Sequence, residues 1–391
     1  DVVRCDALST FFKVASSHPT LINKKMLDEV ALRLRDRKSL VREKAYQGLA
    51  AFYVQIRSHF ADAQWNARQQ KTFDWIPSVL FKGYFANDPQ MRACCCQALQ
   101  TMCTPPSAGA SSDNLTAQAI AFATLVLPSV DEAGQRAIER MFSHMAVFRQ
   151  QFPSLRKRDG EDAVAATLLA KSYKDPSDKS LEARIRKEFL HFGEIRDKIF
   201  WRHVDNLILS SSSVEDFFAA QKYMMSRFRN TSSTPAAVAS QNSFKRHIMQ
   251  MSSCIFLTPH FIQPLLEFVD EQLEGESFDA DLVEPTLLFL QQLAKYFPTS
   301  FQPVVGSVVD LLNFSVPTLE TSGLAILASI GAVVEDDETA TSIQEATSSY
   351  CSRGTPEQAK LAVQAQMKAS KGEATTVLYS LQMELVSQAK L

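Results

Sequence analysis

An all-α fold, built as an α-solenoid of stacked helix pairs, is what this sequence predicts. The first observation is the stretch 36–53, where a turn is followed by a helix whose apolar residues share one face. The second is the return of the same turn pattern further along the chain. The third is the low glycine content, only 12 Gly in 391 residues, which leaves too few for the turns and phosphate loops of a parallel α/β fold. The chain also exceeds the roughly 250–300 residues over which a single core keeps growing.

The repeating unit is clearest just after Asp36, where one helix ends and the Val41-Arg42 pair opens the next. Apolar residues then recur three or four positions apart, the spacing that places side chains on one face of a helix. These residues are Val41, Ala45, Leu49 and Phe52. One helix pair cannot bury both of its faces, so it needs a neighbour on each side. The layout is typical of HEAT-type helix pairs.

A second copy of the unit follows at Asn87-Asp88-Pro89, with Met91-Arg92 in the place of Val41-Arg42. The interval between the two apolar-Arg pairs is 50 residues, slightly more than the roughly 40–47 residues of this repeat class. The excess fits in the polar stretch 62–72. The recurrence therefore favours an array over unrelated helices.

Further helices are expected on both sides of these units, separated by short breakers. The clearest start is Gly354-Thr355-Pro356-Glu357, which offers a Thr cap, a Pro at the first helical position and a Glu in the first turn. The other expected helices run from Asp1 to the break at His18-Pro19-Thr20 and then lie near 21–34, 116–125, 132–152, 162–172, 181–199, 264–273, 284–296, 303–312 and 319–333.

Charge divides the chain more sharply than its net value of −2 suggests. Residues 1–250 carry 35 Lys+Arg and 25 Asp+Glu, whereas residues 251–391 carry 6 and 18. The bias indicates different partners for the two parts, or simply a solvated surface. The expected organisation is basic repeats over 1–103, a flexible loop at 104–114, further helical repeats over 115–229, a flexible connection at 230–243, and acidic repeats over 244–391. We expect the acidic repeats to continue beyond this fragment.

The motifs of several enzyme classes are missing from the sequence. It contains no GxGxxG, GxxxxGK[ST], HExxH or GxSxG. Cys94, Cys95 and Cys96 point about 100° apart on a helix, so they cannot converge on one metal ion. The acidic run 335–338 lacks the glycine and spaced oxygen ligands of a calcium loop. We therefore expect no enzyme, no cofactor and no metal, and no apolar run is long enough to span a membrane.

Several stretches together resemble a known family. They are Val41-Arg42-x-Lys44-Ala45 with Gly48-Leu49-Ala50 and Tyr53, Trp75-Ile76, Pro298-Thr299-Ser300-Phe301, and Gly354-Thr355-Pro356-x-Gln358-Ala359-Lys360 with Ala362. In order and rough spacing they are similar to the middle third of the precocious-dissociation-of-sisters proteins, the HEAT-repeat regulators of cohesin. The resemblance covers nearly the whole chain, and the Gly-Thr-Pro-x-Gln-Ala-Lys stretch is its most specific part.

The resemblance implies a nuclear, chromatin-associated scaffold that acts in sister chromatid cohesion and has no catalytic activity. Its implied partners are the kleisin subunit of cohesin, the wings-apart-like release factor and the cohesin acetyltransferase.

The residues themselves suggest where a partner binds. Eight basic and four acidic residues lie between Lys24 and Lys44, and Arg and Tyr are frequent anchors at interfaces. We expect an extended acidic and apolar kleisin segment to bind there, using Arg37, Lys38, Arg42, Lys44, Tyr46 and Tyr53. For Arg42 an alternative is a structural role, because this arginine commonly bonds the turn Asp of a neighbouring repeat.

Other functions are compatible with the same helices. A generic HEAT scaffold or a transport-type adaptor would differ only in its partner. A DNA-binding solenoid would use the basic half, with an affinity that falls steeply with salt. We expect DNA binding to be weak or indirect, because acidic side chains are interspersed among the basic ones.

Overall fold

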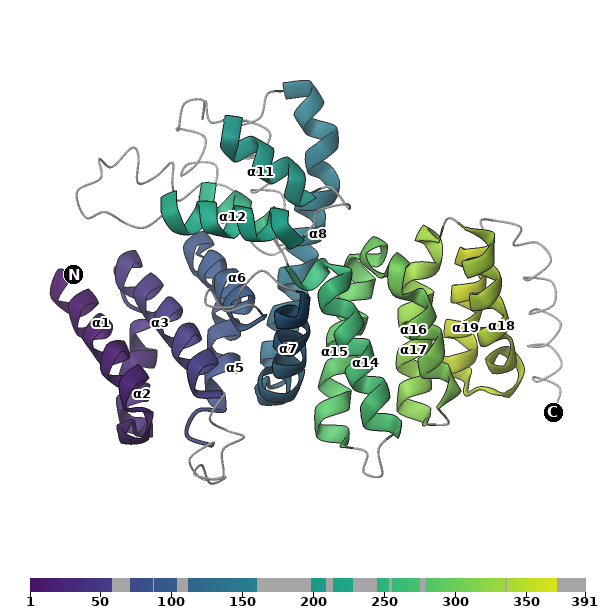
Figure 1. Cartoon of the computed structure of the whole chain (residues 1–391), viewed down its shortest axis with the longest axis horizontal. Coiled ribbons are helices and arrows are strands. Elements are labelled where there is room, and N and C mark those ends of the chain that lie inside the picture. The colour runs from purple at the N-terminus through teal and green to yellow at the C-terminus, as the bar shows by residue number, and fades with distance from the viewer. Residues whose placement is uncertain are drawn as a thin grey trace. The chain divides into compact units, whose positions relative to one another are not determined.

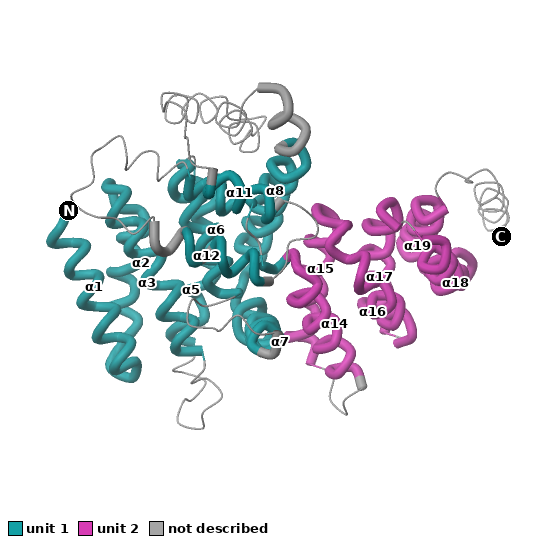
Figure 2. The backbone as a smooth tube through the Cα atoms, turned by 45° about the horizontal axis from the view of Figure 1, so that its top comes forward, with its two compact units in different colours: residues 1–256 teal, residues 257–391 magenta. Residues whose placement is uncertain are grey.

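The computed structural model describes residues 1–57, 71–86, 88–103, 112–159, 198–208, 214–227, 245–252, 255–274, 279–314, 316–334 and 336–370. Within these ranges every regular element is a helix and no strand occurs, which confirms the all-α prediction (Figure 1). The chain divides into two compact units, residues 1–256 and 257–391 (Figure 2). We call them unit 1 and unit 2.

Unit 1 stacks helices side by side around α3. Helix α3 packs against α1 on one side and α6 on the other, with α2 and α5 also touching it, and α5 packs against α8 (Figure 1). A central helix in such a stack has neighbours on several sides and buries most of its circumference. The described helices of unit 1 are α1 (Val2–Ser17), α2 (Lys24–Arg33), α3 (Ser39–Arg57), α5 (Trp75–Lys82), α6 (Pro89–Cys103), α7 (Ser112–Ala121), α8 (Glu132–Asp159), α11 (Lys198–Ile208), α12 (Val214–Arg227) and a helical stretch at 245–252.

The apolar stripe expected on the helix after Asp36 is confirmed. Val41, Ala45, Leu49 and Phe52 are all buried on α3. Burying side chains of the size of Val, Leu or Phe contributes about 1.5–3 kcal/mol each, so this stripe is a major source of stability for the first two helix pairs.

Two glycines allow the helices of unit 1 to approach closely. A methyl group at Gly83, which follows α5, would overlap the hydroxyl of Tyr46 on α3. A methyl group at Gly48 on α3 would overlap the ring of Phe12 on α1. Each glycine therefore makes room for an aromatic side chain from a neighbouring helix.

The described part of unit 2 contains three helix pairs in two rows. Helices α15, α17 and α19 contact one another in succession, as do α14, α16 and α18. This is the arrangement of an α-solenoid, in which each pair is buried by its neighbours. The helices are α14 (Pro259–Glu274), α15 (Ala280–Tyr296), α16 (Val305–Asp310), α17 (Pro317–Ile330), α18 (Asp337–Arg353) and α19 (Pro356–Ala369).

The start of α19 follows the sequence prediction. The Thr355 hydroxyl accepts a hydrogen bond from the Gln358 backbone N–H at 3.2 Å, and the Gln358 side chain accepts one from the Thr355 N–H at 2.9 Å. With Pro356 at the first helical position, this is a complete capping box. The predicted cap residue, Pro position and first-turn Glu are all confirmed.

Two helices expected in unit 2 are present, with starts that differ from the approximate positions suggested by the sequence. The helix predicted from Pro264 begins at Pro259 and contains Pro264, because the Thr258 carbonyl accepts bonds from the N–H groups of both Phe261 and Ile262 and so initiates the helix earlier. The helix predicted near 303–312 is present as α16 (Val305–Asp310) and is preceded by a 3₁₀-helix over Pro298–Val304, which contains Pro303, a residue with no backbone N–H to donate.

Some predictions concern residues outside the described ranges. These include the helix at 162–172, nearly all of the helix at 181–199, the connection 230–243 and most of the loop 104–114. The described residues 245–252 belong to unit 1, although the sequence grouped them with the C-terminal repeats. The reason is a set of polar contacts with α3 and α6, described below.

Candidate partner-binding surface

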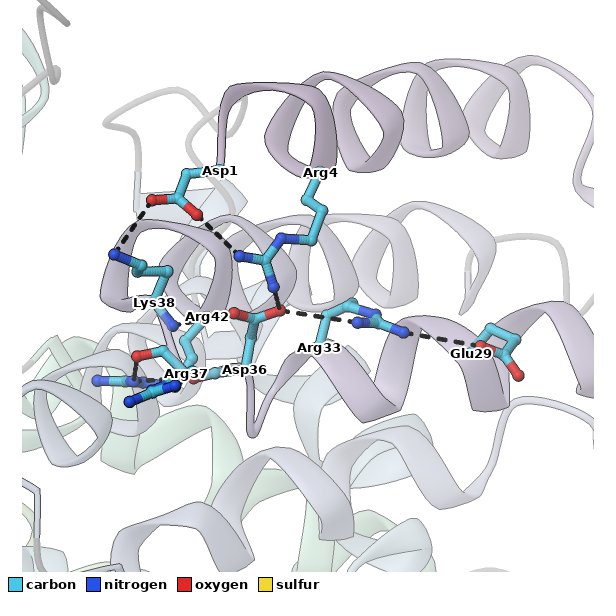
Figure 3. Close-up of polar contacts among 8 residues, drawn as sticks. All are labelled: Asp1, Arg4, Glu29, Arg33, Asp36, Arg37, Lys38 and Arg42. Carbon is cyan, nitrogen blue, oxygen red and sulfur yellow. Dashed lines mark hydrogen bonds and ion pairs between the residues drawn. The ribbon is translucent and has the colours of Figure 1, made fainter.

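The turn between α2 and α3 is organised around the carboxylate of Asp36. One carboxylate oxygen accepts a hydrogen bond from the Lys38 backbone N–H at 2.9 Å, and the other accepts one from Arg4 of α1 at 2.6 Å (Figure 3). Arg33 lies 3.7 Å from the same oxygen. The Lys38 N–H bond, together with the charges of Arg4 and Arg33, lowers the pKa of Asp36 despite its burial. The turn is therefore held by an ionised aspartate.

Arg42 joins this turn to the next one. Its guanidinium donates to the Asp36 carbonyl oxygen at 2.9 Å and to a carboxylate oxygen of Asp88 at 2.9 Å. The other Asp88 oxygen accepts from the backbone N–H groups of Gln90 and Met91, at the start of α6. The Arg42 side chain is only 12% exposed. The structural role considered for this arginine is the one that the structure shows.

Arg4 has the same role in the preceding repeat, and the sequence prediction missed it. It donates to Asp36 as Arg42 donates to Asp88. The signal was present, because Val3-Arg4 is an apolar-Arg pair 38 residues before Val41-Arg42. The third turn aspartate, Asp131, pairs with Lys82 instead.

The two tyrosines expected at the binding surface lie in the core. Tyr53 is fully buried, and its hydroxyl donates to the Leu125 carbonyl oxygen at 2.6 Å. Burial raises the pKa of Tyr53 to about 12 and also raises the pKa of Tyr46. Neither ring is available at the surface, because α3 is covered on more sides than a single apolar stripe suggests. Both tyrosines therefore pack α3 against its neighbours in the core.

The remaining members of the predicted site are exposed. Arg37, Lys38 and Lys44 face solvent, as does Arg35 just before the turn. Among them lies Leu40, an apolar side chain that is 41% exposed. Leu40 and Lys44 are four residues apart on α3 and so share one face of the helix. We call these residues the basic turn surface: Arg35, Arg37, Lys38, Leu40 and Lys44.

An acidic residue in the middle of this sequence does not neutralise the surface. Glu43 is buried and pairs with Arg246, which lies 203 residues later in the chain. In the same stretch, the ring nitrogen Nε2 of His247 lies 2.9 Å from the carbonyl oxygen of Pro89. No local sequence pattern indicates the pairing of Glu43 with Arg246, so it was not predicted from the sequence. The consequence is that the exposed charge of the turn is basic.

The other sequence candidates do not form sites in the described residues. Cys94, Cys95 and Cys96 are buried free thiols, and burial raises the pKa of Cys94 and Cys95 well above its ordinary value. Among the described residues, no group of three or more His, Cys, Asp and Glu side chains could hold a metal ion. None of the described helices has the length and apolar character needed to cross a bilayer.

Stacked helix pairs whose turns are joined by arginine–aspartate pairs, with a basic and partly apolar turn exposed, define a helical-repeat scaffold. The family of sister chromatid cohesion proteins PDS5 has a model that matches residues 1–391, and the chain belongs to this family. Family and fold together point to a non-catalytic scaffold that associates with the cohesin complex.

Other comparisons add little. No curated protein matches the chain. Among solved structures, the crystal structure of an engineered protein aligns with 93% of this chain and 92% of its own length, at 14% identity and a TM-score of 0.24. A similarity at that level supports no argument about fold or function.

Proposed function

We propose that this chain regulates cohesin on chromatin, in the maintenance and release of sister chromatid cohesion, by binding the kleisin subunit at the basic turn surface. The proposal places the protein in the nucleus, in cooperation with the wings-apart-like release factor and the cohesin acetyltransferase. The observation that carries it is the exposure of Leu40 among Arg37, Lys38 and Lys44, in a chain of the PDS5 family.

The chemistry of the surface fits an extended segment that is both acidic and apolar. Arginine and lysine donate charge-assisted hydrogen bonds to carboxylates, and the exposed Leu40 offers apolar contact. Lys38 is 58% exposed, and its ammonium group lies 3.5 Å from the carboxylate of Asp1. That exposed pair is weak, so a partner carboxylate can replace it at small cost.

The buried members of the predicted site have a different role in this proposal. Arg42 fixes the position of the turn relative to α6, and Tyr46 and Tyr53 pack α3 into unit 1. They are positioning residues, which hold the exposed side chains in place. Substituting them changes binding only by altering the fold.

The test is charge reversal at two exposed lysines, Lys38→Glu with Lys44→Glu. Two lost attractions and two new repulsions should weaken binding of a labelled kleisin fragment by about tenfold or more, measured by fluorescence anisotropy. Lys360→Glu with Arg353→Glu is the matched control, because both side chains are exposed in unit 2. Kleisin affinity that is equal in both double variants would contradict the proposal.

The same experiment separates kleisin binding from DNA binding. A basic surface whose main ligand is DNA should lose several powers of ten in affinity between low and physiological salt, because each neutralised phosphate releases counterions. We expect the kleisin fragment to bind at both salt concentrations and a labelled duplex to bind only weakly at the higher one. Submicromolar duplex binding at physiological salt, with no kleisin binding, would reverse this order.

A further inference from the structure

An exposed aromatic residue, Phe85, lies in the repeat that follows the basic turn surface. Phe85, at the end of the 3₁₀ turn Gly83–Phe85, is 42% exposed. Among the large apolar side chains that are exposed in the described ranges, it is the one aromatic. The guanidinium carbon of Arg140 on α8 lies 5.8 Å from the centre of its ring. An exposed apolar side chain therefore lies beside a positive charge here, as Leu40 does in the basic turn surface.

Phe85 and Arg35 occupy equivalent places in successive repeats. Arg42 donates to the carbonyl oxygen of the residue six positions before it, Asp36, and Arg92 donates likewise to Ala86, six positions before it. Arg35 and Phe85 each come directly before that carbonyl residue. Both are exposed. The matching contacts of the two arginines thus put Arg35 and Phe85 at the same point of the repeat.

Direct contacts join the two turns. Arg42 reaches from the first to the second, at 2.9 Å from Asp88 and 3.4 Å from the Gln90 side chain. Packed helices lie roughly 8–10 Å apart, and α3 contacts both α5 and α6. An extended chain advances about 3.3 Å per residue, so about three residues of a partner would span from one turn to the next.

We propose that the bound segment crosses both turns in extended form. One of its carboxylates lies at the basic turn surface, near Arg35, and an apolar or aromatic side chain about three residues away packs against the ring of Phe85. The inference rests on the proposed function and specifies the register of that partner. Charge complementarity selects the acidic portion, and the ring of Phe85 beside Arg140 receives the apolar portion.

Photo-crosslinking tests the register directly. Arg35→p-benzoylphenylalanine and Phe85→p-benzoylphenylalanine are placed separately in the full chain, each is irradiated with the kleisin fragment, and the attached residues are identified by mass spectrometry. We expect attachment sites about two to four residues apart, from the spacing of helices and extended chain. Sites more than about ten residues apart, or attachment from position 35 alone, would overturn the proposed register.

Affinity provides the second readout. Phe85→Ser should weaken kleisin binding by about five- to tenfold, as expected for an aromatic contact at an interface. Val14→Ser is the matched control, since Val14 on α1 is an apolar side chain of similar exposure, 46%. If Lys38→Glu with Lys44→Glu abolishes binding while Phe85→Ser has no effect, the register is wrong and the proposed function stands. If neither has an effect, the proposed function itself fails.

Discussion

The described contacts that join neighbouring helix pairs differ between unit 1 and unit 2. In unit 1, ion pairs connect one repeat to the next, as in the bond from Arg42 to Asp88. In unit 2, the described contacts between neighbouring pairs include ones with at most one charged partner, such as the Tyr350 hydroxyl donating to the Leu312 carbonyl oxygen at 3.1 Å and Lys368 donating to the Ala328 carbonyl oxygen at 2.6 Å. Two ways of joining the same kind of helix pair therefore occur in one chain. We expect unit 1 to respond more strongly to loss of charge and to acid.

The largest difference between the units should follow from Arg42→Met. Methionine keeps much of the apolar stem but removes both the bond to the Asp36 carbonyl and the charge opposite Asp88. Because the pair is largely buried, we expect unit 1 to lose about 2–4 kcal/mol of stability. Hydrogen exchange of α3 and α6 measures this loss, with α17 and α19 as the internal reference.

Gln358→Leu in unit 2 is the corresponding change. It removes the hydrogen bond that the Gln358 side-chain N–H donates to Glu320 and the hydrogen bond that the Gln358 side-chain oxygen accepts from the Thr355 N–H. We expect a loss of about 1 kcal/mol of stability. Equal losses in the two variants would remove the distinction between connections by ion pairs and connections with at most one charged partner.

A smaller difference should appear when two tyrosine hydroxyls are removed. Tyr53→Phe leaves the Leu125 carbonyl oxygen without this donor in a fully buried place, which should cost about 1–2 kcal/mol. Tyr350→Phe removes a similar bond at a partly exposed place, where water can replace the hydroxyl, and should cost about 0.5 kcal/mol. Chemical denaturation of each variant compares the two, and a larger effect at Tyr350 would show that burial does not decide the cost.

A further difference concerns the response to acid. The folded-state pKa of Asp36 is lower than its ordinary value of 3.8, first because of the Lys38 N–H bond. A lowered pKa means that its contribution to stability is complete above that ordinary value and is lost as pH falls toward the folded pKa. Asp36→Asn should therefore reduce the pH dependence of α3 protection below about pH 4, with an effect of about 1 kcal/mol at neutral pH. An unchanged acid dependence would mean that other groups control it.

The sequence was informative where local chemistry decides the structure. The spacing of Val41, Ala45 and Leu49 predicted the buried face of α3, and the residues around Thr355 predicted a helix start that has both bonds of a capping box. Periodicity did not predict that Tyr46 and Tyr53 would also be buried, because one stripe describes a helix with one neighbour and α3 has several.

Pairing between distant segments of the chain was beyond prediction. Glu43 and Arg246 are separated by 203 residues, and neither has a local pattern that identifies its partner. A buried charge needs an opposite charge, so a charged residue at a position near the apolar face of α3 could have indicated that some partner exists. Its identity follows only from the fold.

The arginine–aspartate pairs have a direction along unit 1. In both examples the arginine comes from the earlier repeat and the aspartate from the later one, as with Arg4 to Asp36 and Arg42 to Asp88. A repeat that carries both groups has a donor for the repeat after it and an acceptor for the repeat before it. If a segment of the gene encoding one such repeat were duplicated, the new copy would bring both halves of the connection with it. Arrays of this kind can thus lengthen by duplication without first acquiring a new interface.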